Sequence, residues 1–393
     1  MYILIISPAG YSQTLNTPEI LPGVYDIQQY LPLIASRKVG LVMNHTSIVN
    51  STNLADTLMN LGVNIRGIVE IGRIFTPEHG FKGSVEAGTY IDDEIYSNST
   101  IPVISLYGEK LKPDREDLEG IEIMIFDLQD VGVRFFTYLS TLHYIMEACA
   151  EQHIPLILLD RPNPNGHYID GPVLDEHYRS FVGLHPVPVV YGMTIGEYAC
   201  MINGEHWLAD SVLCELTIIK CQNYTHKSYY TLPVPPSPNL PDMRSVYLYP
   251  STAFFEGTVV SEGRGTDFPF QIMGHPGYSD HSFSFIPRPM KGKSLNPRFK
   301  DIECFGIDLR KKSISSLRDE GKINLHYVVQ FYNDLAMGEN FFIDYFDLLS
   351  GNNELRNQIQ RGLTVEEIRQ SWEEELVVFK KIRAKYLLYP DFE

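Results

Sequence analysis

The amino-acid sequence predicts an α/β fold, in which a domain with a mostly parallel sheet is followed by a second domain. Short apolar runs typical of buried strands alternate with amphipathic segments of helical period, which is the pattern of βαβ units. The chain has 393 residues, more than one hydrophobic core usually supports. We therefore expect two domains, residues 20–215 and residues 216–393.

The elements follow from the spacing of apolar residues. Five apolar runs are expected to form strands: residues 38–44, 64–69, 103–106, 121–127 and 156–159. Helices are expected over residues 52–62 and 138–152, because apolar residues recur there at i, i+3 or i+4, and i+7. Thr194 and Glu197 have the spacing of a capping box and predict another helix start. A single long amphipathic helix is expected over residues 364–389.

Polar residues follow the strand at residues 121–127, in the sequence D-L-Q-D-V-G-V-R. In open α/β sheets, ligands bind beyond the carboxyl ends of the strands. Asp127, Gln129, Asp130 and Arg134 therefore stand where a site is expected. The alternative is that the aspartates cap the next helix and pair with Arg134. We favour a site, because four polar residues fall within a short stretch and Tyr138 and two phenylalanines follow.

The segment I-F-T-P-E-H-G-F-K-G predicts a tight loop that carries Glu78 and His79. Pro77, Gly80 and Gly83 are incompatible with a helix there. A carboxyl group held on a rigid loop beside aromatic residues suits a general acid. The alternative is that it merely accepts backbone hydrogen bonds to close the turn.

Further candidates lie in other loops. Asn44 and His45 stand at the end of the first strand, and the stiff D-R-P-N-P-N-G loop after residues 156–159 presents Asp160, Arg161 and Asn163. The segment F-F-E-G-T-V-V-S-E-G-R-G-T-D-F-P-F alternates glycines with charged residues, which is unusual in a merely structural loop. Its charges come from Glu256, Glu262, Arg264 and Asp267.

Composition excludes several classes of partner. The formal net charge of −17 argues against nucleic acid and anionic membrane surfaces, since both require clustered Lys and Arg. A small anionic substrate is compatible with this negative net charge if a few arginines line its pocket. The 5 cysteines are scattered without a C-x-x-C pair, so neither a disulfide framework nor a zinc ribbon is indicated.

The N-terminal run Y-I-L-I-I has no preceding Lys or Arg, and small residues follow it. A complete secretory signal has a basic start and a longer apolar core. We interpret the run as the remnant of a signal whose start lies upstream, rather than as ordinary sequence. The expected location is the cell envelope, as a periplasmic or secreted protein, or the cytoplasm if the chain starts as given.

Eight motifs occur along the chain in one order: N-H-T-S, P-E-H-G-F-K-G, S-L-Y-G, F-D-L-Q-D-V-G-V-R-F-F-T-Y, L-D-R-P-N-P-N-G, Y-G-M-T-I-G-E, P-S-P-N-L and S-E-G-R-G-T. Together they closely resemble the family once called DUF1343, which includes exo-β-N-acetylmuramidases of the NamZ type. The resemblance runs from about residue 24 to the C-terminus. It implies a Rossmann-like catalytic domain, a smaller α+β auxiliary domain and a cleft between them. The implied activity is release of N-acetylmuramic acid (MurNAc) from non-reducing ends of peptidoglycan glycan chains, as in cell-wall turnover.

The resemblance points to the glutamate of the P-E-H-G motif, here Glu78, as the leading catalytic candidate. Glu78 would donate a proton to the leaving oxygen of the MurNAc–GlcNAc linkage. Asp127, Asp130 or Glu262 would then stabilise the oxocarbenium-like transition state, activate water or attack the sugar. The N-acetyl group of the substrate is an alternative nucleophile.

The expected partner is a peptidoglycan-derived MurNAc–GlcNAc glycan. Because arginine binds carboxylates bidentately, at least one of Arg134, Arg161 and Arg264 is expected to bind the lactyl carboxylate of MurNAc. No cofactor and no metal is expected, and the oligomeric state stays open. The candidate substrate-binding residues are Asn44, His45, His79, Gln129, Arg134, Tyr138, Asp160, Arg161, Asn163, Tyr191 and Arg264.

Three other functions compete with this hypothesis. The same cleft could serve a non-catalytic protein that binds cell-wall amino sugars. A nucleotide-dependent enzyme is disfavoured, because no G-x-G-x-x-G follows the first strand and no P-loop is present. A divalent-metal hydrolase built on Glu78, His79 and Asp127 is the third alternative.

Overall fold

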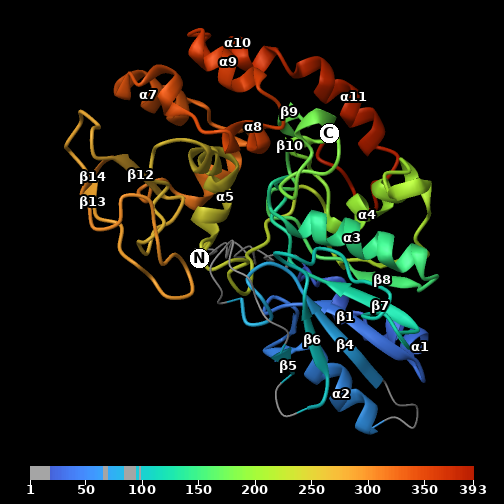
Figure 1. Ribbon diagram of the computed structural model, residues 1–393. Helices are drawn as coiled ribbons and strands as arrows, with labels where there is room; N and C mark the ends of the chain where they lie inside the picture. Colours follow the sequence, from blue (N-terminus) through green and yellow to red (C-terminus); the bar gives the residue numbers. More distant parts are fainter. Residues whose placement is uncertain (1–17, 65–69, 84–93, 97–98) are drawn as a thin grey trace, which may run out of the picture.

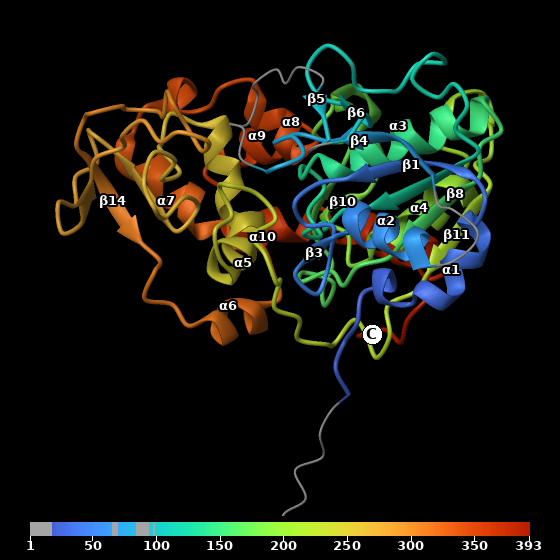
Figure 2. The same ribbon diagram turned by 90° about the horizontal axis from the view of Figure 1, so that it is seen from below.

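The computed structural model describes residues 18–64, 70–83, 94–96 and 99–393, and it contains two domains that lie side by side (Figure 1). The N-terminal apolar run and residues 65–69 of the expected second strand lie outside the described residues. Viewed from below, β14 and α7 lie at one end of the molecule and α1 at the other (Figure 2). No helix in the described part of the chain is long and apolar enough to span a bilayer.

A seven-stranded sheet forms the first domain, in the order β11-β8-β7-β1-β4-β6-β5. The neighbouring strands described in it are parallel, except for β5 with β6 at the edge. Counted along the chain, the parallel strands have the 3-2-1-4-5-6 order of Rossmann folds. The strands are β1 (Lys38–Met43), β4 (Glu70–Thr76), β5 (Glu94–Ile95), β6 (Pro102–Ser105), β7 (Ile123–Asp127), β8 (Leu156–Leu159) and β11 (Leu216–Ile219).

The strands are apolar on both sides because helices cover both faces of the sheet. Alternate residues of a strand point to opposite faces, so Leu41 packs in one core and Val42 in the other. The core containing Leu41 also holds α1 and α2, whereas the core containing Val42 holds α3 and α4. The helices and short elements of this domain are η1 (Gly23–Tyr25), α1 (Ile27–Ile34), β2 (Ile48–Val49), β3 (Thr52–Asn53), α2 (Leu54–Asn64), α3 (Tyr138–Glu151), β9 (Asp170–Val173), η2 (Glu176–Tyr178), β10 (Pro188–Val190), α4 (Ile195–Gly204) and η3 (Ala209–Ser211).

The second domain combines a small antiparallel sheet with helices, which makes it α+β. Its sheet has the order β12-β14-β13. The chain then returns to the first domain, where the Tyr389 hydroxyl donates a hydrogen bond to Asp160 Oδ2 at 2.6 Å. The elements are α5 (Met243–Thr252), η4 (Ala253–Gly257), β12 (Ile272–His275), β13 (Ser284–Phe285), β14 (Cys304–Asp308), α6 (Ile314–Glu320), α7 (His326–Leu335), η5 (Gly338–Phe341), α8 (Tyr345–Ser350), α9 (Glu354–Gln360), α10 (Val365–Gln370) and α11 (Glu373–Arg383).

One expectation about the elements needs correction. The helix expected over residues 364–389 is instead two helices, α10 and α11, although the capping box of Thr364 and Glu367 is present at its start. The break falls at Trp372, whose side chain is buried in the core while the helix restarts at Glu373. The described part of the expected second strand begins at Glu70 as β4 (Glu70–Thr76), and residues 65–69 lie outside the described residues. The strand β11 (Leu216–Ile219) forms the edge of the first sheet, next to β8.

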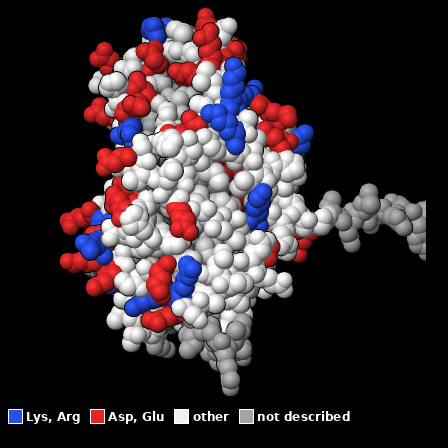
Figure 3. Space-filling view, turned by 90° about the vertical axis from the view of Figure 1, so that its right-hand side faces the viewer, with Lys and Arg blue, Asp and Glu red and all other residues white. Residues whose placement is uncertain are grey.

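Charged side chains of both signs are visible on one face of the molecule (Figure 3). On the face seen in Figure 3, acidic and basic side chains lie interspersed, often next to one another. Several exposed or half-exposed pairs are salt bridges, such as Lys110 with Asp114 at 3.0 Å and Lys385 with Glu205 at 3.1 Å. Such pairs contribute little to stability because water screens them.

Candidate active site

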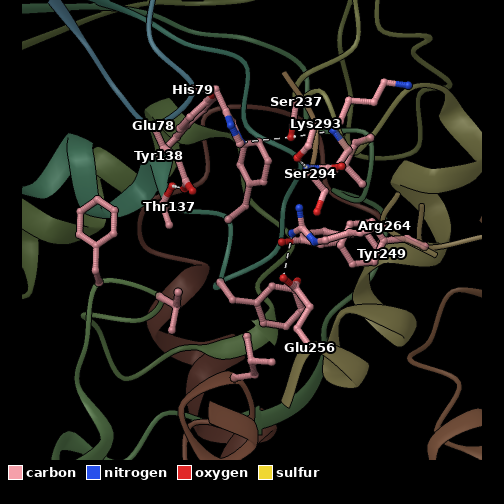
Figure 4. A pocket seen from close by; sticks show the side chains of 18 of the residues that line it. Glu78, His79, Thr137, Tyr138, Ser237, Tyr249, Glu256, Arg264, Lys293 and Ser294 are labelled. Atoms are coloured by element: carbon pink, nitrogen blue, oxygen red, sulfur yellow. Dashed lines mark hydrogen bonds and ion pairs between the residues drawn. The ribbon is translucent and has the colours of Figure 1, made fainter. Parts of the chain in front are cut away.

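A cavity of about 480 Å³ lies between the two domains. Side chains of both domains line it, and Figure 4 shows Glu78 and Thr137 on one wall with Arg264 and Glu256 on another. Several aromatic rings complete the walls. The lining residues used below are Glu78, His79, Thr137, Tyr138, Ser237, Asn239, Glu256, Arg264, Lys293 and Tyr345.

The loop after β4 carries Glu78 to the cavity, as the sequence predicts. His79 adopts the left-handed backbone conformation with φ 70°, which few residues other than glycine adopt. Gly83 has φ 58°, and a Cβ there would meet the His45 ring at 2.0 Å, so the close approach requires glycine. Thr137 Oγ1 donates a hydrogen bond to Glu78 Oε2 at 2.8 Å. The carboxyl group is therefore held in place from the start of α3.

The proline-rich segment of residues 233–241 forms a wall above this loop. His79 Nε2 lies 3.2 Å from Ser237 Oγ, and His45 Nε2 lies 2.8 Å from the Pro235 carbonyl oxygen. Burial lowers the pKa of His45. His79 lines the cavity, whereas His45 supports the loop from behind.

Tyr138 lies at the switch point of the sheet, where β1 and β7 are neighbours. Asn44, directly after β1, donates a hydrogen bond from Nδ2 to the Tyr138 hydroxyl at 2.8 Å. Burial and the nearby charge of Glu78 raise the pKa of Tyr138. Tyr138 thus faces the cavity, and Asn44 orients it from below.

The second domain contributes Glu256, Arg264 and Glu262. Arg264 Nη2 lies 2.8 Å from Glu256 Oε2, and Arg264 Nε lies 3.1 Å from Glu262 Oε1. Burial lowers the pKa of Arg264, but the charges of the two carboxylates outweigh burial and raise this pKa above its ordinary value. Glu256 and Arg264 line the cavity, and Glu262 lies behind Arg264.

Asp127 and Arg161 form a buried pair away from the cavity. Arg161 Nε donates to Asp127 Oδ1 at 2.5 Å and Nη2 donates to Oδ2 at 2.9 Å. Both side chains are at most 1% exposed. Neither group is among the residues that line the cavity, so the pair stabilises the strand ends beneath it.

Asp130 and Tyr191 form a second buried unit. The Tyr191 hydroxyl donates a hydrogen bond to Asp130 Oδ2, and the Gly132 amide donates to the same oxygen at 2.7 Å. Burial raises the pKa of Asp130 to about 6. These two residues also lie outside the cavity lining.

Arg134 links the two domains instead of facing the cavity. Its Nη1 donates to the carbonyl oxygens of Pro172 and Val187, and its Nη2 donates to those of Leu349 and Ser350, at 2.7–3.0 Å. The guanidinium is thereby committed to four backbone acceptors. The expectation that it binds a substrate carboxylate therefore has no support in this geometry.

The other expected binding residues also support the fold from within. Gln129 donates to the carbonyl oxygens of Asp130 and Pro162, each at 2.8 Å. Asn163 Nδ2 donates to the Met193 carbonyl oxygen at 2.7 Å. Asp160 accepts hydrogen bonds from Thr194, Gly196 and Tyr389, and burial raises its pKa to about 6.

Of the expected residues, the cavity therefore brings together Glu78, His79, Tyr138 and Arg264. Sequence reasoning missed Glu256, Lys293 and Tyr345 as site residues. Glu256 had a signal, because it lies in the glycine-and-charge segment already singled out. Lys293 and Tyr345 lie in no motif and reach the cavity through the fold of the second domain. The described residues contain no cluster of three or more His, Cys, Asp or Glu that could hold a metal ion.

The fold and the site define a class: a two-domain α/β protein whose interdomain cavity is lined by carboxylates and aromatic rings, as in glycoside-hydrolysing enzymes. Family models described as exo-beta-N-acetylmuramidase NamZ, N-terminal and C-terminal, match residues 39–244 and 247–389. The chain belongs to the NamZ family.

Individual relatives agree with this assignment. The chain is 35% identical to the peptidoglycan beta-N-acetylmuramidase NamZ of Bacillus subtilis strain 168, across 98% of this chain and 94% of that protein. A crystal structure of a DUF1343 family protein from Bacteroides fragilis has a TM-score of 0.86 and 42% identity, covering 95% of this chain and 100% of the other. A second DUF1343 family structure from the same organism has a TM-score of 0.76 and 28% identity, covering 94% of this chain and 99% of the other.

Proposed function

We propose that this protein is an exo-acting β-N-acetylmuramidase, which releases MurNAc from the non-reducing ends of peptidoglycan glycan chains. The observation that carries the proposal is a carboxyl group, Glu78, held in an interdomain cavity opposite a second carboxylate, in a chain of the NamZ family. We propose the cell envelope as its place of action, because the substrate is there.

Glu78 is proposed as the general acid. Its loop has a left-handed backbone at His79 and packs closely against the His45 ring at Gly83. Thr137 Oγ1 fixes Oε2. The carboxyl group then protonates the glycosidic oxygen as the bond to the anomeric carbon breaks, which makes the sugar alcohol a better leaving group.

The experiment that tests this proposal uses peptide-free glycan strands and mass analysis of the released products. The wild-type protein is expected to release MurNAc one residue at a time from the chain end. The variant Glu78→Gln keeps the shape of the side chain but cannot donate the proton, and is expected to be about 10² to 10⁴-fold slower. The exposed Glu116 provides the control, since Glu116→Gln lies outside the cavity.

Three outcomes would contradict the proposal or the mechanism proposed for it. Release by Glu78→Gln at the rate of Glu116→Gln would exclude Glu78 as the acid. Saturable binding of MurNAc without any release by the wild-type protein would favour the non-catalytic binding protein. Restoration of activity by one divalent metal after chelation would support the metal-dependent alternative.

Lys293 is proposed to bind the lactyl carboxylate of MurNAc. The three arginines that were expected to bind this group have other partners. Arg134 donates to four carbonyl oxygens, and Arg161 pairs with Asp127. Arg264 pairs with two glutamates. Lys293 lines the cavity and has a salt-bridge distance of 3.9 Å to Asp267, whose side chain is 76% exposed. Such a loose pair is easily exchanged for a substrate carboxylate.

The lysine proposal is tested by substrate preference. Lys293→Met is expected to lower kcat/KM for MurNAc glycosides by about 10 to 100-fold, because a charged hydrogen bond contributes about 1.5–3 kcal/mol. The activity on GlcNAc glycosides, which lack the lactyl group, is expected to stay unchanged. Lys291→Met removes an exposed lysine two residues away and serves as the control. An equal loss of kcat/KM on the MurNAc and GlcNAc glycosides would show that Lys293 does not bind the lactyl group.

A further inference from the structure

The cavity contains a carboxylate that the sequence did not mark as catalytic. Glu256 lies in η4 of the second domain, and its side chain is 19% exposed although the residues around it are buried. Figure 4 shows it on the wall that faces Glu78. We infer that Glu256 is the second catalytic carboxylate, which faces the anomeric carbon and accepts the proton of the attacking water. This inference rests on the proposed function.

The other carboxylates considered for this role are committed elsewhere. Asp127 forms a buried ion pair with Arg161. Asp130 accepts hydrogen bonds from Tyr191 and Gly132 below the cavity. Glu262 lies behind Arg264. Among the described residues that line the cavity, the carboxyl groups are those of Glu78 and Glu256.

Arg264 orients Glu256 without using the whole carboxylate. The hydrogen bond from Nη2 goes to Oε2, at 2.8 Å. Arg264 also lies over the Phe270 ring at 5.3 Å from its centroid, and Glu262 holds its Nε, so the guanidinium is fixed from three sides. A carboxylate with one oxygen anchored to a fixed cation presents its other oxygen in a defined direction.

The two carboxyl groups also interact through their charges. Burial raises the pKa of Glu256; Arg264 opposes this, while Glu262 and Glu78 raise it further. Burial and then the charges of Glu256 and Glu78 raise the pKa of Tyr345, which lines the same cavity. The two carboxyl groups therefore lie close enough to one another for the charge of Glu78 to act on Glu256.

The chemical step balances with these two groups. The water oxygen forms a bond to the anomeric carbon and its proton goes to Glu256. The bond between the anomeric carbon and the glycosidic oxygen breaks, and that oxygen takes the proton of Glu78. After release of both sugars, the proton on Glu256 and the vacancy on Glu78 are exchanged with solvent. Until the water bonds, the carboxylate stabilises the positive charge that develops at the anomeric carbon.

The experiment compares Glu256→Gln with Glu262→Gln, because both changes remove one carboxylate from the same arginine. Release is measured with the natural MurNAc–GlcNAc linkage and with a 4-nitrophenyl MurNAc glycoside, whose leaving group needs no proton. Glu256→Gln is expected to lower kcat by about 10³-fold on both substrates, and Glu262→Gln by less than about tenfold. Glu78→Gln is expected to be severe only on the natural linkage.

A pH profile separates a catalytic role from a structural one. The wild-type kcat/KM is expected to fall on the acidic side as the base is protonated, and Glu256→Gln is expected to lose that limb. Glu256→Ala with added azide provides a second readout: azide attacks the anomeric carbon without losing a proton, so release is expected to recover at least tenfold.

The inference is overturned if Glu256→Gln is as active as Glu262→Gln, or if its loss is confined to the natural linkage. Absence of azide recovery in folded Glu256→Ala, judged by an unchanged melting temperature, would also overturn it. In each case release by the wild-type protein leaves the proposed function standing. Failure of the wild-type protein to release MurNAc would instead remove the proposed function itself.

Discussion

Two arginine–carboxylate clusters, one beneath the cavity and one in its wall, differ in the number of carboxylates per arginine and in exposure. In the first domain Arg161 meets one carboxylate, Asp127, and both side chains are at most 1% exposed. In the second domain Arg264 meets two, Glu256 and Glu262, and the pair with Glu256 is 19% exposed on both sides. The buried pair of Arg161 with one carboxylate stabilises the fold. The partly exposed cluster, in which Arg264 has two carboxylates, keeps one carboxylate available to a ligand.

The largest expected effect comes from breaking the buried pair. Asp127→Asn leaves the Arg161 guanidinium buried without a counter-charge and turns an amide group towards it. We expect the free energy of unfolding to fall by about 3–5 kcal/mol. Chemical denaturation at neutral pH measures this loss. The folded fraction should keep its kcat within a few fold, and a large drop in kcat with unchanged stability would make Asp127 part of the site after all.

A smaller effect is expected at Asp130, a buried carboxyl group whose hydrogen bonds come from Tyr191 and Gly132. Burial raises its pKa to about 6, from 3.8. Because the folded protein holds this proton more tightly than the unfolded chain, the stabilisation is complete below about pH 4 and is lost as the pH rises through about 6. Because the pKa of Asp130 is higher by about 2 in the folded protein, the stabilisation amounts to about 3 kcal/mol at most.

The variant Asp130→Asn isolates this contribution. Its free energy of unfolding, compared with that of the wild-type protein, is expected to improve as the pH is raised from 4 to 7. Denaturation at several pH values gives the difference directly. The exposed Asp175→Asn is the opposite control, because hydrogen bonds from His177 lower the pKa of Asp175. A difference between Asp130→Asn and wild type that does not change with pH would show that Asp130 is not the group that titrates.

The smallest effect is expected from Glu262→Gln, the counterpart of Asp127→Asn in the partly exposed cluster. Arg264 keeps Glu256 as a partner, and the glutamine oxygen can still accept the hydrogen bond from Nε. We expect a loss of about 1 kcal/mol or less. Thermal or chemical denaturation measures it beside Asp127→Asn. Equal losses in the two variants would erase the distinction between the clusters.

The parts of the fold that depend on local pattern could be predicted from the sequence. The strands β1, β7 and β8 and the helices α2, α3 and α4 follow from apolar period and caps. The Glu78 loop follows from Pro77 and the glycines, which allow few backbone conformations. The expected single helix of residues 364–389 is interrupted at Trp372, where the backbone leaves helical geometry (φ −105°, ψ 1°), and the apolar period of the sequence does not reveal such a break.

By itself, the sequence determined the α/β class, the position of Glu78 and membership of the family, because each depends on residues close together or on ordered motifs. Only the tertiary structure decided which strand-end residues face the cavity. A buried polar group must find a partner, and here the partners are distant in sequence: Asp127 and Arg161 are 34 residues apart, and Arg134 and Leu349 are 215 apart. Residues whose polar groups pair with one another in this way are not available to a substrate. Glu256 is available, because its carboxylate stays partly exposed.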